Sequence, residues 1–302
     1  MDIQWFPGHM LKTQRLIQEN LGKVDVFFEV VDSRAPLATS NPLLEKLIQG
    51  KPRVVLLNKI DLCDSHILAL WRQWWDARPE TLSVPISCKE RKNLPALRHA
   101  AENACRHKKW FGLRRVRAMI VGVPNVGKST LINSLSGGHK ASTAPKPGHT
   151  KGLQRINTEA FDLVDTPGIL WHKFEDPEVG IRLALLGSIK DEILSSLDLA
   201  AQLYRFLARD YPKAAERHFG AVVEGADPWV YLEAWGRQHG MLKHGGEVDE
   251  ERLAQTLLAQ FRTGKLGRFS LERPPVSNMI SSLGSSTPDS FKDVTVSVAP
   301  QG

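Results

Sequence analysis

The sequence predicts an α/β fold in which a mostly parallel sheet, flanked by helices, is followed by a small all-helical domain. Three observations carry this prediction. Short apolar runs such as 53–57 and 118–121 alternate with longer amphipathic stretches, the pattern of buried strands connected by helices. The segment 122–129 reads Gly-Val-Pro-Asn-Val-Gly-Lys-Ser and stands between such a run and a helical stretch. From residue 176 onward, apolar residues recur at helical spacing.

The expected elements alternate through the first part of the chain. Strands are expected over 24–31, 53–57, 82–86, 118–121 and 161–164. Helices are expected over 11–21, 41–49, a tryptophan-rich stretch around 71–75, 94–107 and 130–135.

Three segments follow from this pattern. We expect a first domain over 1–175, a helical domain over 176–272 and a disordered tail over 273–302, where Pro, Ser, Gly and Asp dominate. Stripes such as Leu253, Leu257 and Phe261 are expected to face the core of the helical domain.

Segment 122–129 has the Gly-x-x-x-x-Gly-Lys-Ser form of a phosphate-binding loop. Its glycines allow successive backbone N–H groups to point inward, and the following helix adds the positive end of its dipole. Lys128 would reach the β- and γ-phosphates, and Ser129 would offer its hydroxyl to Mg²⁺. A chance glycine-rich turn is disfavoured by the flanking strand and helix. The residues expected around the nucleotide here are Pro124, Asn125, Val126, Gly127, Lys128, Ser129 and Thr130.

Asn58-Lys59-Ile60-Asp61 follows the expected strand 53–57, at the sheet edge where α/β proteins bind ligands. This tetrapeptide resembles the guanine-reading motif of GTPases. Asp61 can accept hydrogen bonds from the guanine N1–H and its exocyclic amine, and adenine offers no matching pair of donors. Asn58 would tie this loop to the phosphate loop, and the stem of Lys59 would lie over the base. An ATPase is therefore disfavoured.

Ser87-Cys88-Lys89 comes after the expected strand 82–86 and resembles the second base-contacting motif, usually Ser-Ala-Lys. In that motif a backbone N–H contacts the guanine O6. Cys88 replaces the usual alanine. Because both side chains are small and the contact is made by the backbone, we expect the motif to function.

Two further motifs point to the γ-phosphate. Thr150 follows a Gly- and Ser-rich stretch, and its hydroxyl would complete the Mg²⁺ shell; Ser142 and Thr143 are the weaker candidates. Asp165-Thr166-Pro167-Gly168 has the form Asp-x-x-Gly. Asp165 would hold a Mg²⁺-bound water, and the Gly168 N–H would sense the γ-phosphate.

The order of these motifs is unusual. In ordinary small GTPases the phosphate loop comes first and the base-reading motifs last, whereas here both base-reading motifs precede it. This order indicates a circular permutation. The chain resembles the YlqF/RbgA group of circularly permuted GTPases, over residues 5–272. The resemblance includes the nucleotide motifs, Trp-Phe-Pro-Gly-His-Met at 5–10, Asp-Ser-Arg-Ala-Pro-Leu at 32–37, Gly-Ile-Arg-Leu-Ala at 180–184 and Gly-Arg-Phe-Ser-Leu-Glu at 267–272.

This resemblance implies a circularly permuted P-loop GTPase fold and a function. The protein would bind and hydrolyse GTP to control a late step in assembly of the large, 50S-type ribosomal subunit. Its cofactors would be GTP or GDP, Mg²⁺ and K⁺, and its partners the large-subunit precursor and its rRNA, docked with help from the helical domain. A monomer is expected. The alternatives are a guanine-nucleotide-gated ribosome-binding protein with negligible hydrolysis and, less favoured, a GTPase acting on the small subunit.

The resemblance also implies roles for two residues. Ile169 occupies the place where many GTPases carry a water-orienting glutamine. Hydrolysis is then either slow and stimulated by a partner such as the ribosomal subunit, or assisted by another polar group, for which His9 is the candidate. His9 could equally be a surface or RNA-contacting residue. Asn125 would ligate K⁺ in place of an arginine finger, or it merely braces the loop. The expected catalytic set is His9, Lys128, Thr150 and Gly168.

Composition indicates the kind of partner and the cellular compartment. The net charge is +7, and basic residues gather among aromatics in the segment 106–117, which is either an RNA-facing surface or a solvated linker. Cys63, Cys88 and Cys105 lie far apart, which favours a reducing compartment and neither a disulfide framework nor a zinc site. No apolar run resembles a signal peptide or is long enough to cross a bilayer, so a cytoplasmic protein without a membrane partner is expected.

Overall fold

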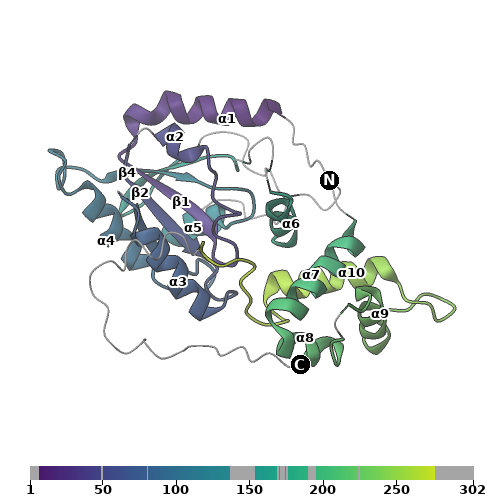
Figure 1. Cartoon of the computed structure of the whole chain (residues 1–302). Helices are drawn as coiled ribbons and strands as arrows, with labels where there is room; N and C mark the ends of the chain where they lie inside the picture. The colour runs from purple at the N-terminus through teal and green to yellow at the C-terminus, as the bar shows by residue number, and fades with distance from the viewer. Residues whose placement is uncertain are drawn as a thin grey trace, which may run out of the picture.

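A six-stranded sheet forms the centre of the first part of the chain, with strand order β3-β2-β1-β4-β6-β5 (Figure 1). The computed structural model describes residues 7–48, 50–79, 81–136, 154–168, 170, 174, 176–189, 195–223 and 225–275, without the side chains of residues 7–12, 45 and 154. The strands are β1 (Val26–Asp32), β2 (Arg53–Asn58), β3 (Thr81–Pro85), β4 (Val116–Val121), β5 (Gln154–Asn157) and β6 (Phe161–Asp165).

Neighbouring strands from β3 to β6 are parallel, and β5 alone pairs antiparallel, at the edge beside β6. Every residue of β1 is buried because helices cover both faces of the sheet. Phe27 and Val31 point to the face that carries α1 (Pro7–Asn20), α2 (Leu44–Ile48) and α3 (Ser65–Asp76). Alternate residues point to the other face, against α4 (Leu94–Cys105) and α5 (Lys128–Leu135).

The predicted elements differ from the observed ones in two informative places. The helix predicted over 11–21 begins earlier, at Pro7, because proline is well tolerated in a first helical turn. Strand β5 was not predicted, since Gln-Arg-Ile-Asn has no apolar run; it is held by its ladder with β6.

The second part of the chain forms five helices among its described residues, gathered beside the sheet in Figure 1. Acidic or hydroxyl side chains cap four of them, and prolines open three, so their starts are set by local chemistry. They are α6 (Pro177–Leu185), α7 (Ser196–Asp210), α8 (Pro212–Phe219), α9 (Pro228–Gln238) and α10 (Glu250–Thr263).

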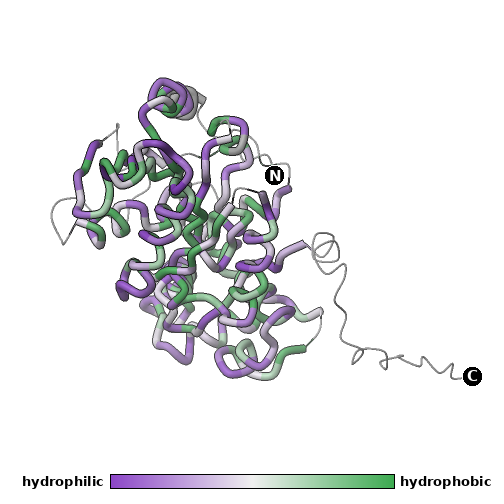
Figure 2. The backbone as a smooth tube through the Cα atoms, turned by 90° about the vertical axis from the view of Figure 1, so that its left-hand side faces the viewer, coloured by the Kyte–Doolittle hydropathy of each residue, from purple (hydrophilic) through white to green (hydrophobic). Residues whose placement is uncertain are grey.

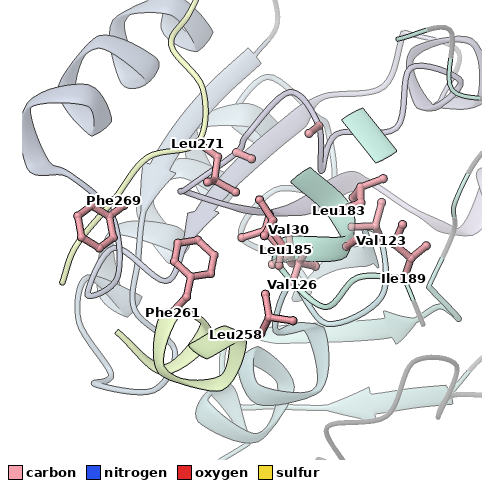
Figure 3. Packing of buried hydrophobic residues seen from close by; sticks show 14 of the residues in the cluster. Val30, Val123, Val126, Leu183, Leu185, Ile189, Leu258, Phe261, Phe269 and Leu271 are labelled. Atoms are coloured by element: carbon pink, nitrogen blue, oxygen red, sulfur yellow. The ribbon is translucent and has the colours of Figure 1, made fainter. Parts of the chain in front are cut away.

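One hydrophobic core joins the sheet to these helices. Val123 and Val126, from the loop after β4, belong to the same buried cluster as residues of α6 and Leu258 and Phe261 of α10 (Figure 3). Figure 2 shows apolar segments running through the middle of the molecule and polar ones mainly around its outside. None of the described helices has the length and apolar character needed to cross a bilayer.

The stretch 267–272 leaves α10 and returns to the first part of the chain. The Phe269 N–H donates to the Leu62 carbonyl at 3.1 Å, and the Leu271 N–H donates to the Arg34 carbonyl at 2.6 Å. These backbone bonds hold the end of the helical part against loops that follow β1 and β2. We call 267–272 the returning strap.

Glu272 ends the returning strap with a nearly buried carboxylate. It accepts hydrogen bonds from the backbone N–H groups of Leu37 and Ala38, and Arg182 lies 3.7 Å away. Burial raises the pKa of this carboxyl from 4.5 to about 7, against the opposing effects of Arg182 and the two N–H groups.

The raised pKa predicts a pH dependence of stability. Between its unfolded and folded pKa values Glu272 is protonated only in the native state, so the free energy of unfolding should fall as pH rises through this window. Relative to Glu272→Gln, the wild type should lose about 2–3 kcal/mol between about pH 5 and pH 8, measured by urea unfolding. A difference that changes in the opposite direction would mean that the carboxyl is ionised in the native state, contrary to this account.

Candidate nucleotide-binding site

The loop between β4 and α5 requires glycine at two positions. At Gly122, where φ is +150°, an added Cβ would lie 2.4 Å from the Val30 carbonyl oxygen. At Gly127, where φ is +106°, it would lie 2.3 Å from Asn58 Nδ2. The backbone of the loop is therefore packed against β1 and against the end of β2, and a side chain at either position would open it.

Lys128, the first residue of α5, is buried and folds back over this loop. Its Nζ donates to the carbonyl oxygens of Gly122, at 3.0 Å, and Val123, at 2.8 Å. Burial lowers the pKa of the ammonium to about 8, and Asp165 opposes that shift. An arriving phosphate would supply the negative charge that favours the protonated form. Ser129 and Thr130 follow in the first helical turn and are half-buried.

Asn58 joins three of the predicted motifs. Its Nδ2 donates to the Val126 carbonyl at 2.7 Å, and its Oδ1 accepts the Cys88 N–H at 3.1 Å. The predicted tie between the base-reading loop and the phosphate loop is present, and it extends to the second base-reading motif. Cys88 itself is buried in the core, and Lys89 beside it is exposed.

Asp61 and Ser87 form a second link between the base-reading loops. The Ser87 hydroxyl donates to Asp61 Oδ1 at 2.7 Å and accepts the Glu90 N–H at 3.1 Å. One oxygen of the Asp61 carboxylate is thereby held in place, which orients the other. A carboxylate held in this way suits a partner that presents two N–H donors side by side.

Lys59 is anchored by Asp32, a residue for which the sequence predicted no role of its own. Its Nζ lies 2.8 Å from Asp32 Oδ2 and donates to the Asn125 carbonyl at 2.7 Å. Asp32 is fully buried at the end of β1; burial alone would raise its pKa, but Arg34 and Lys59 hold the pKa of this carboxyl well below its usual range. The sequence signal for Asp32 is its position directly after the mostly apolar stretch 24–31.

Asn125 has a positive φ of 60° and contacts the helical part. Its Nδ2 donates to the Gly187 carbonyl, just beyond α6, at 2.5 Å. This bond braces the phosphate loop. It uses only the amide nitrogen, whereas a cation would need the side-chain oxygen Oδ1.

The Asp-x-x-Gly motif lies directly beside the phosphate loop. Asp165 is buried and pairs in register with Ile120 of β4, and the Thr166 hydroxyl donates to the Ile120 carbonyl at 2.8 Å. A Cβ at Gly168 would lie 2.9 Å from the backbone nitrogen of Pro124. Only glycine allows this close approach, and it places the Gly168 backbone where the phosphates are expected.

Several predicted residues lie outside the described part of the chain. His9 falls in the first turn of α1, but its side chain is not among those described. The predicted positions Thr150, Ser142, Thr143 and Ile169 lie outside the described residues altogether.

The oxygen ligands proposed for Mg²⁺ suit that ion. Ser129 lies in the first turn of α5 and Asp165 ends the adjacent strand β6, so a hydroxyl and a carboxylate flank the loop. Within the residues that the structure describes, no group of three or more His, Cys, Asp or Glu side chains could form a protein-only metal cage. This donor set fits Mg²⁺, which typically binds through one or two protein ligands, water and substrate phosphates.

Comparisons with known proteins agree with this geometry. The 50S ribosome-binding GTPase family matches residues 117–222. The chain is 38% identical over 281 residues to ribosome biogenesis GTPase A of Bacillus cereus, covering 91% of this chain and 95% of that protein. The Bacillus licheniformis protein of the same name is 39% identical over 281 residues, covering 91% and 99%. A GDP-bound structure of YlqF from Thermotoga maritima is similar with a TM-score of 0.63 and 27% identity, over 86% of this chain and 99% of that one.

Proposed function

The chain belongs to the ribosome biogenesis GTPase A family and is a GTP hydrolase, and on that premise we propose that it controls a late step in assembly of the large ribosomal subunit. The observation that supports this most directly is the Asn58 side chain, which bonds to both the phosphate loop and the second base-reading motif. Motifs in permuted order thus form one nucleotide site. The partners we propose are the large-subunit precursor and its rRNA, bound by a cytoplasmic monomer.

The proposed roles in the site follow from position and chemistry. The Asp61 carboxylate, oriented by Ser87, reads the guanine N1–H and amine. The Lys128 ammonium and the N–H groups of the phosphate loop bind the β- and γ-phosphates. When bound, Mg²⁺ would be held by Ser129 and Asp165, with Thr150 as the proposed switch ligand, and would neutralise phosphate charge.

Three further roles are proposed for hydrolysis itself. His9 orients the attacking water in place of the glutamine that Ile169 replaces. Asn125 would hold K⁺ through its side-chain oxygen, since its amide nitrogen already donates to the Gly187 carbonyl, and the ion would supply positive charge toward the phosphates. The Gly168 N–H contacts the γ-phosphate from the position that its approach to Pro124 allows.

The test is GTP turnover in K⁺ and in Na⁺ buffer, alone and with purified large or small ribosomal subunits. We expect slow turnover alone, strong stimulation by large subunits only, and lower rates in Na⁺. His9→Ala should abolish the stimulated rate while leaving GDP affinity unchanged. Absence of stimulation by either subunit would instead favour a guanine-nucleotide-gated binding protein with negligible hydrolysis.

A further inference from the structure

A groove of about 490 Å³ lies on the sheet face that carries α1, beyond the end of that helix. Its polar lining comes from the end of α1 and the turn after it, from the start of β4 and from β5 and β6: Asn20, Lys23, Arg117, Arg155, Asn157 and Asp162. Strand pairing explains why these side chains meet. In the backbone register, Arg117 of β4 lies opposite Asp162 of β6, and Asp162 lies opposite Asn157 of β5. Side chains from three adjacent strands therefore stand in one row on one face.

The groove is separate from the nucleotide site. The phosphate loop follows the carboxyl end of β4, whereas Arg117 is the second residue of that strand, four residues before Val121. At about 3.3 Å per residue, this puts roughly 13 Å of strand between the row and the phosphate loop. A ligand in the groove would therefore leave the nucleotide site open.

Three cations of the groove carry uncompensated charge. Lys23, Arg117 and Arg155 are exposed, and none of them forms an ion pair within the described part of the chain. Glu19 and Glu159 are the exposed acidic residues near this end of the sheet in sequence, and neither is paired with these cations.

The carboxylates of Asp162, in the groove, and Asp25, beside it in sequence, bind two other arginines. Asp162, inside the groove, lies 2.8 Å from Arg115 Nε. Asp25, next to the groove residue Val24, accepts both terminal nitrogens of Arg114, at 2.7 and 2.9 Å. The carboxylates thus hold the basic segment 106–117 against the sheet, and the groove cations remain available to an anion.

The basic segment 106–117 leads into β4, which carries the groove residue Arg117. Arg106, Lys108 and Lys109 are exposed there, and Phe111 and Leu113 are 36% and 84% exposed. The Arg114 guanidinium stacks on Trp110, 3.8 Å from the ring centroid. Cations beside amide donors and an exposed aromatic ring fit RNA, because phosphates attract the cations and unpaired bases stack on rings. An acidic peptide would use the cations but not the ring.

We propose that the groove binds backbone phosphates of ribosomal RNA through Lys23, Arg117 and Arg155, with Asn20 and Asn157 as additional donors. The identity of the RNA rests on the proposed function. The groove places an RNA contact on the first part of the chain, on a surface distinct from both the nucleotide site and the helical part.

The test compares two full-length triple variants with the same change in charge. Lys23→Gln, Arg117→Gln and Arg155→Gln together remove the groove cations. Arg72→Gln, Arg98→Gln and Arg209→Gln together form the control, since these arginines are 58% to 66% exposed and each already pairs with a carboxylate. Binding to transcribed large-subunit rRNA and to purified large subunits is measured at several salt concentrations. GDP affinity should remain unchanged in both variants.

We expect the groove variant to bind rRNA about 10- to 100-fold more weakly and to lower the slope of log K against log salt by about 2 to 3, as loss of three phosphate contacts requires. In the control variant, both the rRNA affinity and the salt slope should change by only a small fraction of these amounts. Equal losses in both variants would overturn the proposal, as would preferential binding of polyglutamate over rRNA in the groove. If wild-type protein bound neither rRNA nor large subunits, the proposed function itself would fail.

Discussion

Replacing Asp61 by asparagine is expected to change the preferred base from guanine to xanthine. The Ser87 hydroxyl donates to Asp61 Oδ1, and the asparagine side chain retains an oxygen that can accept that bond. The second position then changes from a carboxylate oxygen to an NH₂ donor. Guanine presents an amine there, which leaves two donors facing each other, whereas xanthine presents a carbonyl that the new NH₂ can bind.

The expected change is large because buried donors without partners are costly. A site built to accept hydrogen bonds rejects a mismatched ligand by about 10⁴-fold, so the GDP affinity of the variant should fall by roughly that factor. Its XDP affinity should rise above its GDP affinity. Isothermal titration with GDP and XDP measures both. Asp64→Asn provides the matched control, because Asp64 caps α3 through His66 and Ile67 and asparagine caps a helix equally well.

An Asp61→Asn variant that kept its GDP affinity would show that Asp61 does not read the base. The proposed assignment of the first base-reading loop would then be wrong. Loss of both GDP and XDP binding, with normal unfolding, would mean that Ser87 does not hold the new side chain in place.

The parts of the site that the sequence predicted are those whose geometry is local. A phosphate loop needs glycine where φ is positive and lysine at the start of a helix, and both requirements fall within the segment 122–129. The loops at 58–61 and 165–168 follow apolar strands, and parallel strands place their carboxyl ends at one edge. Their meeting could therefore be predicted without knowledge of distant contacts.

Other features depend on partners far apart in the chain. Arg34 contacts the carbonyl oxygens at the end of α10, more than 220 residues later in the chain. No local sequence pattern predicts that contact. The sequence alone also shows the basic residues of 106–117 only as one cluster. In the structure Arg114 and Arg115 are held by Asp25 and Asp162, so the available charge lies on their neighbours and in the adjacent groove.

Replacing Arg34 by methionine is expected to lower the free energy of unfolding by about 3–5 kcal/mol. Arg34 is 1% exposed and binds Asp32 through Nε, at 2.9 Å, and Nη2, at 2.8 Å. Methionine retains most of the stem but leaves the buried carboxylate with Lys59 as its remaining cation. Urea unfolding measures the loss. Arg72→Met is the control, because its exposed pair with Asp76 should contribute less than about 1 kcal/mol.

The same variant tests whether the base-reading loop and the helical part share this buried charge. Asp32 holds Lys59 on one side and Arg34 on the other, and Arg34 Nη1 reaches the carbonyls of Phe261 and Arg262 at 3.5 Å. If the contact couples the two parts, Arg34→Met should lower hydrogen-exchange protection in the last turn of α10 and weaken GDP binding together. Loss of protection in α10 with unchanged GDP affinity would show that Arg34 only stabilises the fold, because Lys59 would then keep its position without it.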